Sequence, residues 1–211
     1  MFEYHTLAIV LKKEALNEAD ANVILYTKEL GKLEIIAKGI KKTISKFGGH
    51  LEPLNLIEAT IIAVNNKHLT SVLTVDNFSL IREDYLKLEN ALKMIGIFNE
   101  AIVSSEKDEF IWEILLNYLK ELNETIIPTE EKKQFFIQLL NLQFLIRLGR
   151  SLGVLPDKEE LREYFDKNTA SLIIFLSQNS PQDIIEKYDI SKLQKIDYNK
   201  IEKSIKQKII I

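Results

Sequence analysis

Cysteine is absent from this chain of 211 residues. Its absence excludes disulfide bonds, zinc sites built from thiolates and a cysteine nucleophile. It fits a reducing compartment, although some secreted bacterial proteins also lack cysteine. No apolar run approaches the roughly 20 residues that cross a bilayer, and the start Met-Phe-Glu-Tyr-His lacks the basic residues of a signal peptide. We therefore expect a cytoplasmic protein with no membrane partner.

Sequence signatures of enzymes are also missing. The chain has no GxxxxGK[ST], GxGxxG, HExxH or GxSxG motif, and His5, His50 and His68 lack metal-ligand spacing. Glu18 and Asp20 are the carboxylate pair that a metal-dependent nuclease would use, but a turn between two strands explains them and is favoured. We expect no enzyme, no catalytic residue, no metal site and no cofactor.

Positive charge is concentrated locally, although the net charge of the chain is −3. Between residues 28 and 50, six lysines face only Glu29 and Glu34, which gives a local net charge of +4. The segment 191–211 also carries +4, from six lysines against two acids. Such segments can hold an anion even when the whole protein is acidic. The alternative is a solvated lysine-rich loop.

The segment 1–80 has the pattern of β-strands and is rich in β-branched and apolar residues. Gly31 follows Glu29 and Leu30 and suits a hairpin turn, because glycine adopts positive φ without strain. Strands are expected over residues 6–11, 22–27, 32–38, 56–64 and 69–75. Five short strands suit a small closed barrel, since closure removes exposed strand edges. An OB-type barrel is the leading candidate.

From about residue 82 the apolar residues recur every three or four positions, which predicts helices. Thr129 is a candidate N-cap, and Gly153 is a candidate terminator of the helix that Thr129 begins. Helices are expected over residues 86–102, 110–122, 129–152, 157–165 and 170–176, and from a capping box at Ser191 to about residue 209. The fold class is therefore α+β, with a barrel domain over residues 1–80 and an all-helical domain over residues 81–211.

A basic connector over residues 39–50 joins the third and fourth predicted strands. Its lysines can contact phosphates with release of counterions, and its glycines let a nucleic-acid strand approach the backbone. Phe47 and Tyr26 can stack on bases, as aromatic residues do on barrel surfaces. Trp112 is interpreted as a core residue. Together these features favour nucleic-acid binding.

The same residues resemble the RecO family of DNA repair proteins. Three runs carry the resemblance over roughly residues 5–58: Leu-Tyr-Thr-Lys-Glu-Leu-Gly-Lys-Leu at 25–33, Ala-Lys-Gly-Ile-Lys-Lys at 37–42 and Ser-Lys-Phe-Gly-Gly-His-Leu-Glu-Pro at 45–53. The opening strand and the Glu-Ala-Asp turn at 18–20 resemble the family too. Beyond residue 80 the match is weaker, and residues 143–156 are similar to the helix end that precedes the zinc module of many members.

The resemblance implies an OB fold, a helical C-terminal domain, binding of single- and double-stranded DNA, and annealing of complementary strands. It also implies partnership with RecR, loading of RecA onto DNA coated with single-strand binding protein, contact with the C-terminal tail of that protein, and association with the nucleoid. Members that hold zinc use four cysteines, so this chain resembles a short member without the zinc module. The alternative is a protein-interaction adaptor with an OB-like barrel and no DNA role.

Carried onto this sequence, the resemblance assigns phosphate contacts to lysines of the matching motif. The expected DNA-binding residues are Lys32, Lys38, Lys41, Lys42, Lys46 and, as a stacking residue, Phe47. An acidic tail with an aromatic end needs a basic rim beside an apolar pocket. The candidates for that partner site are Lys132, Lys133, Arg147 and Arg150. The alternative for these four residues is ordinary surface charge on helices.

Overall fold

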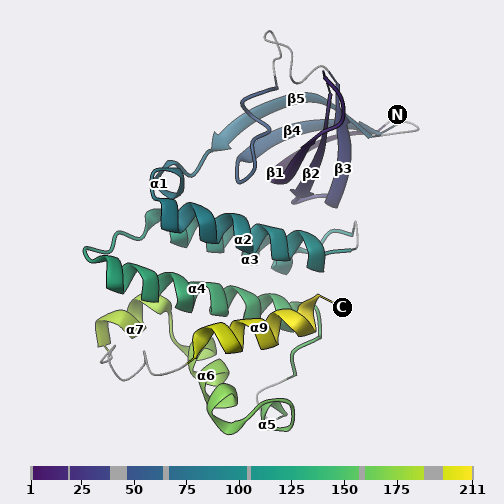
Figure 1. Ribbon diagram of the computed structural model, residues 1–211. Coiled ribbons are helices and arrows are strands. Elements are labelled where there is room, and N and C mark those ends of the chain that lie inside the picture. Colours follow the sequence, from purple (N-terminus) through teal and green to yellow (C-terminus); the bar gives the residue numbers. More distant parts are fainter. Residues whose placement is uncertain are drawn as a thin grey trace. The chain divides into compact units, whose positions relative to one another are not determined.

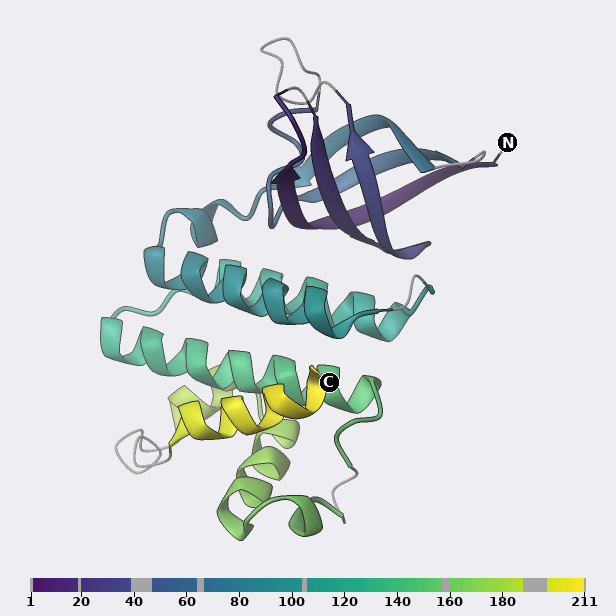
Figure 2. The same cartoon turned by 45° about the vertical axis from the view of Figure 1, so that its right-hand side comes forward.

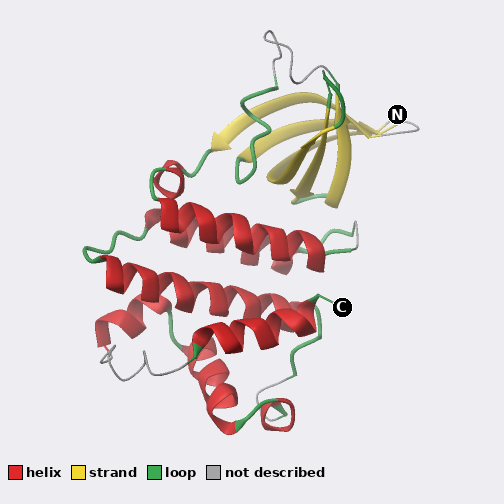
Figure 3. Cartoon of the chain, viewed as in Figure 1, coloured by secondary structure: helices red, strands yellow, loops and turns green. Residues whose placement is uncertain are grey.

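A computed structural model describes residues 2–18, 20–38, 47–63, 67–103, 106–156, 160–187 and 197–210. The chain forms two compact units, residues 1–116 and residues 117–211. Strands come first and helices follow (Figure 3), which confirms the α+β class expected from the sequence.

The N-terminal unit contains a five-stranded antiparallel sheet with the strand order β3-β2-β1-β4-β5. The strands are β1 (Phe2–Ala15), β2 (Ala21–Thr27), β3 (Gly31–Ala37), β4 (Leu56–Ala63) and β5 (Lys67–Asp76). The sheet curves strongly (Figures 1 and 2), and its edge strands β3 and β5 contact each other. The OB-type barrel is therefore confirmed.

The barrel core follows from the alternation of side chains along each strand, since successive residues point to opposite faces. In β3, buried Leu33 and Ile35 alternate with exposed Glu34 and Ile36. Central strand β1 places Ala8 opposite both Thr27 of β2 and Ile57 of β4. The buried cluster comprises Ala8, Val10, Ala21, Val23, Leu25, Leu33, Ile35, Ala37, Leu51, Ile57, Ala59, Ile61 and Val72.

Helices α1 (Ser79–Arg82) and α2 (Tyr85–Ala101) follow β5, and α3 (Glu109–Glu124) begins in the same unit. Tyr26, from the outer face of β2, is only 1% exposed. Its ring meets Phe98 edge-on at 4.9 Å and stacks on Trp112 at 6.4 Å between centroids. The expectation that Tyr26 stacks on bases is therefore wrong, whereas the core position of Trp112 is confirmed.

The second unit is built around α4 (Glu130–Ser151), whose faces contact α6 (Lys167–Gln178), α7 (Pro181–Lys187) and α9 (Tyr198–Ile209). Helix α9 lies along α4 (Figures 1 and 2) and buries Ile201, Ile205 and Ile209. A buried polar pair lies inside this unit. The Tyr118 hydroxyl donates to Asn141 Oδ1 at 2.9 Å, as expected for a polar group removed from water.

Several helix ends agree with the sequence. Thr129 Oγ1 caps α4 by accepting from Lys132 N, and Gly153 follows α4 with a φ of 69°. Helix α9 begins at Tyr198, capped by Asp197, whereas the expected capping box at Ser191 lies outside the described residues. Helix α5 spans only Leu161–Tyr164, and the first three residues of its expected capping box, 157–159, are also outside that range.

Helix α7 and the extent of the first unit differ from the sequence expectations. No helix was expected over Pro181–Lys187, yet Ser180 Oγ accepts from Asp183 N and starts one there. The change from strand to helix falls at Ser79, while the compact unit continues to residue 116. The division into domains 1–80 and 81–211 stays a prediction.

None of the helices in the described ranges combines the length and apolar character needed to cross a membrane.

Candidate nucleic-acid interface

The structure describes Lys38, the residue before the basic connector, and the last four residues of the connector, 47–50. Lys38 directly follows β3 and is exposed. Lys41, Lys42 and Lys46 lie outside the described residues. Phe47 begins the returning segment, which leads into β4 at Leu56. Of the expected phosphate ligands, Lys38 is thus the one described lysine whose side chain is open to solvent.

Lys32 has its ammonium on the end of helix α2. Its Nζ donates to the carbonyl oxygens of Ile102, at 2.8 Å, and of Asn99. Desolvation by burial lowers the pKa of Lys32, and nearby Glu34 opposes this shift. The last carbonyls of a helix lack partners inside the helix, so Lys32 acts as their cap. A DNA contact of Lys32 stays a prediction, and it would require the ammonium to leave these carbonyls.

Phe47 anchors the returning end of the connector. Its half-buried ring packs against the barrel core, and its carbonyl accepts from His50 N at 3.1 Å and Leu51 N at 3.2 Å. These contacts give Phe47 a structural role at the start of a turn. Stacking of Phe47 on a base stays a prediction, and it would require the ring to leave this position.

A polar pocket of about 490 Å³ follows this turn, lined by Gly49, His50, Glu52, Asn55, Thr74, Asn77 and Arg82. Asn55 organises it: its Nδ2 donates to the carbonyls of Gly49 at 3.2 Å and His50 at 2.9 Å, and its Oδ1 accepts from Arg82 Nη2 at 2.8 Å. Sequence reasoning placed His50 in the basic connector, rejected it as a metal ligand, and missed Arg82. No sequence signal joins them, because three separate segments build the pocket.

Glu18 and Asp20 belong to a turn, as favoured from the sequence. Asn17 Nδ2 donates to Asp20 Oδ2 at 2.9 Å, and Asp20 N donates to Asn17 Oδ1 at 2.8 Å. This is the local side-chain pairing by which Asn and Asp stabilise turns. Among the described residues, no group of three or more His, Cys, Asp or Glu side chains is arranged to hold a metal ion.

The four expected partner-binding residues fall into two groups on α4. Lys132 and Lys133 are in its first turn, where Lys133 pairs with Glu130 at 2.7 Å. Arg147 and Arg150 are near its last turn, about 21 Å further along at 1.5 Å per residue. Burial raises the pKa of Glu121, and exposed Arg147 opposes this shift. The Nε and Nη2 atoms of Arg150 are buried, and no described group forms a hydrogen bond with them.

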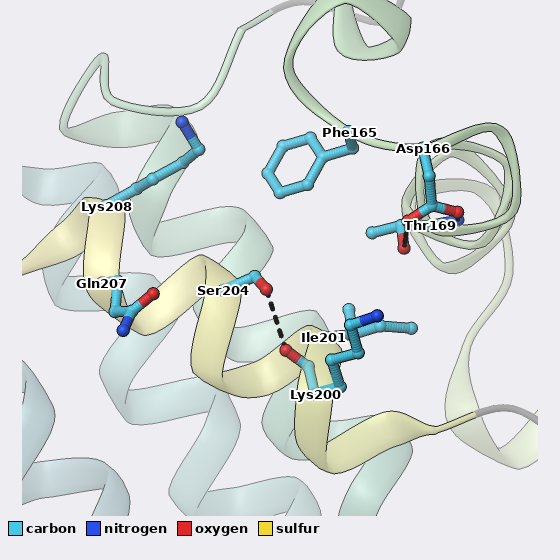
Figure 4. A pocket seen from close by; sticks show the side chains of 8 residues that line it. All are labelled: Phe165, Asp166, Thr169, Lys200, Ile201, Ser204, Gln207 and Lys208. Atoms are coloured by element: carbon cyan, nitrogen blue, oxygen red, sulfur yellow. Dashed lines mark hydrogen bonds between the residues drawn. The ribbon is translucent and has the colours of Figure 1, made fainter.

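A second pocket, of about 370 Å³, lies in the helical unit between α9 and the segment from Phe165 to Thr169 (Figure 4). Lys208 Nζ is 5.5 Å from the centroid of the Phe165 ring, a cation–π contact. Asp166 caps α6, and its hydrogen bond from the Thr169 hydroxyl is the largest cause of its lowered pKa. The pocket thus presents both signs of charge and favours no single ligand class.

The chain matches known proteins over both units. Residues 1–79 match the family described as Recombination protein O N terminal. The chain is 32% identical over 183 residues to DNA repair protein RecO of Thermodesulfovibrio yellowstonii, covering 81% of this chain and 68% of that protein. Identity to the proteins of the same name is 27% over 157 residues in Cutibacterium acnes and 25% over 170 residues in Listeria monocytogenes.

These two matches cover 73% and 77% of this chain, but only 62% and 63% of the relatives' own lengths. The match to the Thermodesulfovibrio protein extends well past the barrel, since 183 matched residues exceed the 116 of the first unit. The barrel topology, the sequence of the connector and the sequence identity to RecO proteins all agree, and the chain belongs to the RecO family.

Proposed function

We propose that this protein is a non-enzymatic DNA repair and recombination mediator that binds single- and double-stranded DNA and anneals complementary strands. The observation that carries the proposal is an OB-type barrel with Lys38 directly after β3 and with Lys41, Lys42 and Lys46 in the connector between β3 and β4. The names of the relatives, DNA repair protein RecO, support the same role. OB folds bind nucleic acid by combining charge along a groove with stacking.

Lysine contacts to phosphate carry no sequence information. Binding is therefore independent of base sequence and weakens steeply as salt rises, because each phosphate contact releases counterions. Strand annealing follows if one protein surface screens the charges of two complementary strands at once. No covalent chemistry is needed for this function.

A strand-annealing assay across salt concentrations, with and without single-strand binding protein, tests the proposal. The variant is the triple change Lys41→Glu, Lys42→Glu and Lys46→Glu, which reverses the charge of the connector and should abolish annealing while the fold stays intact. The matched control changes exposed Lys93, Lys120 and Lys167 to Glu, with the same effect on net charge. Equal losses in both variants would mean that only overall charge matters. Full annealing by the connector variant would refute the site assignment.

The proposal extends to partners. The protein works with RecR, receives the acidic C-terminal tail of single-strand binding protein, and so promotes RecA loading. We place the tail carboxylate at exposed Arg147, near the last turn of α4. Lys132 and Lys133 lie at the other end of α4, where Lys133 already pairs with Glu130. Binding of a labelled acidic tail peptide should weaken in Arg147→Glu and persist in Lys132→Glu. If Lys132→Glu weakens binding and Arg147→Glu does not, the tail binds at the first turn of α4 instead.

The adaptor alternative makes a different prediction in the same experiments. An adaptor binds its protein partner but shows no affinity for oligonucleotides at low salt, and its connector lysines are dispensable. Absence of DNA binding by the unaltered protein would therefore replace the mediator role with this one.

A further inference from the structure

Arg82 is held in the polar pocket by neutral oxygen atoms alone. Its Nε donates to the Asn77 carbonyl at 2.7 Å, and its Nη2 donates to the Pro53 carbonyl at 2.7 Å and to Asn55 Oδ1 at 2.8 Å. Within the described part of the chain, no carboxylate forms an ion pair with it. The positive charge of this half-buried guanidinium is therefore fixed in place without a counterion.

The donors that Arg82 has left can be counted. A guanidinium has five N–H groups, one on Nε and two on each terminal nitrogen. The three hydrogen bonds use the Nε group and both Nη2 groups, so the two Nη1 groups find no acceptor among the described residues. Nη1 is not among the buried side-chain atoms that lack a partner, so its two N–H groups are open to solvent and available to an incoming anion.

His50 supplies a further donor to the same pocket. The backbone N–H of Thr74 donates to His50 Nδ1 at 3.1 Å, and the Thr74 hydroxyl lies 2.8 Å from the same nitrogen. A backbone N–H is always a donor, so Nδ1 must be an acceptor and the ring proton must sit on Nε2. The two Thr74 contacts hold the ring, while Asn55 binds both the His50 carbonyl and Arg82 Nη2.

The one acid that lines this pocket, Glu52, is already neutralised. Its Oε1 lies 2.6 Å from Lys13 Nζ, on strand β1. The pocket therefore keeps the charge of Arg82. An anion that enters it meets two Nη1 donors and is not repelled by an unpaired carboxylate of the lining residues.

Both loops that hold Arg82 contain a non-glycine residue with positive φ. Leu54, between Pro53 and Asn55, has a φ of 77°, and Phe78, directly after Asn77, has a φ of 49°. Such backbone is strained and persists where surrounding structure enforces it, often at ligand sites. Both side chains are fully buried, so the core fixes the carbonyls that orient Arg82.

We propose that this pocket is a phosphate-binding site that receives one backbone phosphate of a bound DNA strand, with Arg82 Nη1 and His50 Nε2 as donors. The inference rests on the proposed DNA binding and extends it to a second place on the barrel. Phe47, which begins the turn into the pocket, follows Lys46 of the connector directly. A strand that contacts the connector lysines thus has a fixed cationic site close by in the chain.

The test is binding of a labelled oligo(dT) to the full chain across salt concentrations, by fluorescence anisotropy. Arg82→Gln should weaken binding about tenfold, the value of a charge-assisted hydrogen bond. It should also reduce the slope of log K against log salt by about 0.7, the share of one phosphate on a single strand. Arg82→Lys should retain the slope.

Because Arg82→Gln also removes hydrogen bonds inside the unit, a second variant avoids them. Asn77→Asp places a carboxylate at the exposed edge of the pocket and should reproduce the loss of affinity and slope with an unchanged unfolding temperature. Its matched control is Asn117→Asp, at an exposed site on α3. His50→Asn keeps an acceptor near Thr74 N and removes the Nε2 donor, so affinity should fall while the slope stays constant.

The outcomes separate this inference from the proposed function. If the unaltered protein binds oligo(dT) and Asn77→Asp changes neither affinity nor slope, the phosphate site is refuted and the DNA-binding function stands. If the unaltered protein does not bind at low salt, both fail. If Asn77→Asp leaves DNA binding intact but removes binding of a polyglutamate peptide, the pocket takes protein carboxylates and the inference is overturned.

Discussion

Lys32 and Ile102 are joined by a 2.8 Å hydrogen bond from the lysine Nζ to the carbonyl oxygen. The contact connects strand β3 to the end of helix α2 in the first unit. A second contact nearby has the same effect, since Lys107 Nζ pairs with Glu29 of the β2–β3 turn at 3.1 Å. The hairpin is therefore fixed to the segment that links α2 and α3.

Lys32→Met should destabilise the first unit by about 1.5–3 kcal/mol, because two hydrogen bonds from a charged group are lost. Chemical denaturation followed by the fluorescence of Trp112, the single tryptophan, measures this. The control is Lys38→Met, at an exposed site just after β3, which should change stability by less than about 0.5 kcal/mol. Equal effects of the two changes would contradict the capping role.

Tyr26→Ala should cost about 3–5 kcal/mol, the usual penalty for truncating a buried aromatic residue. The emission of Trp112 should shift to longer wavelength, because its stacked neighbour at 6.4 Å is removed. Tyr26→Phe keeps the ring and should leave both stability and DNA affinity nearly unchanged. A large loss of DNA affinity in Tyr26→Phe would instead place the Tyr26 hydroxyl at the DNA surface.

Alkaline pH should destabilise the second unit through Tyr118. Burial raises the pKa of this phenol well above 10.0, and Glu202 adds to the shift. The folded state thus holds its proton more tightly than the unfolded state, so the stabilisation is complete below pH 10.0 and is lost as pH rises toward the folded-state pKa.

The measurement is the free energy of unfolding, by far-UV circular dichroism in urea, below and above pH 10.0. Tyr118→Phe removes this titration and should show a smaller alkaline loss than the unaltered protein. Some loss should remain, since burial also raises the pKa of Tyr198 to about 12. Identical pH profiles would show that Tyr118 does not contribute.

Gly149→Ala should destabilise the second unit by about 1–3 kcal/mol, the usual cost of overpacking. A Cβ atom there would lie 2.7 Å from Leu155 Cδ1 and 2.8 Å from Leu155 Cγ. Gly96→Ala is the matched comparison inside α2, where no atom lies within 4 Å of an added Cβ. That change should stabilise by up to about 1 kcal/mol, because alanine favours helix over glycine. Thermal unfolding tests whether Gly149→Ala lowers the unfolding temperature and Gly96→Ala raises it.

The strands could be predicted because their pattern is local. The alternation of buried and exposed side chains in β3 is a property of consecutive residues. The same holds for the turn at Gly31, whose φ is 64°. Strand β1 runs further than expected, from Phe2 to Ala15, with a register shift between Val10 and Lys12. Helix α7 was missed because Asn179-Ser180-Pro181 indicates the end of the helix before it, while Ser180 also caps the helix that follows.

The candidate sites were harder to predict because they depend on tertiary packing. Whether Tyr26 faces water or a helix is decided by Phe98 and Trp112, which come from helices far along the chain. The pocket likewise needs His50, Thr74 and Arg82 from three segments. Only the charge of the connector is a property of the sequence alone.

Strand β1 is paired with β2 on one side and with β4 on the other, and Ala8 stands opposite Ile57. The barrel therefore closes only after two segments that are distant in sequence meet, a non-local step of the kind that slows folding. The entropy of closing such a loop grows slowly, by about 0.6 kcal/mol for each doubling of its length. Loop entropy alone would therefore let the segment between β3 and β4 change length at little cost. Buried Leu51 and Leu54 fix the part of this segment that leads into β4, so length changes are tolerated only outside that packed part.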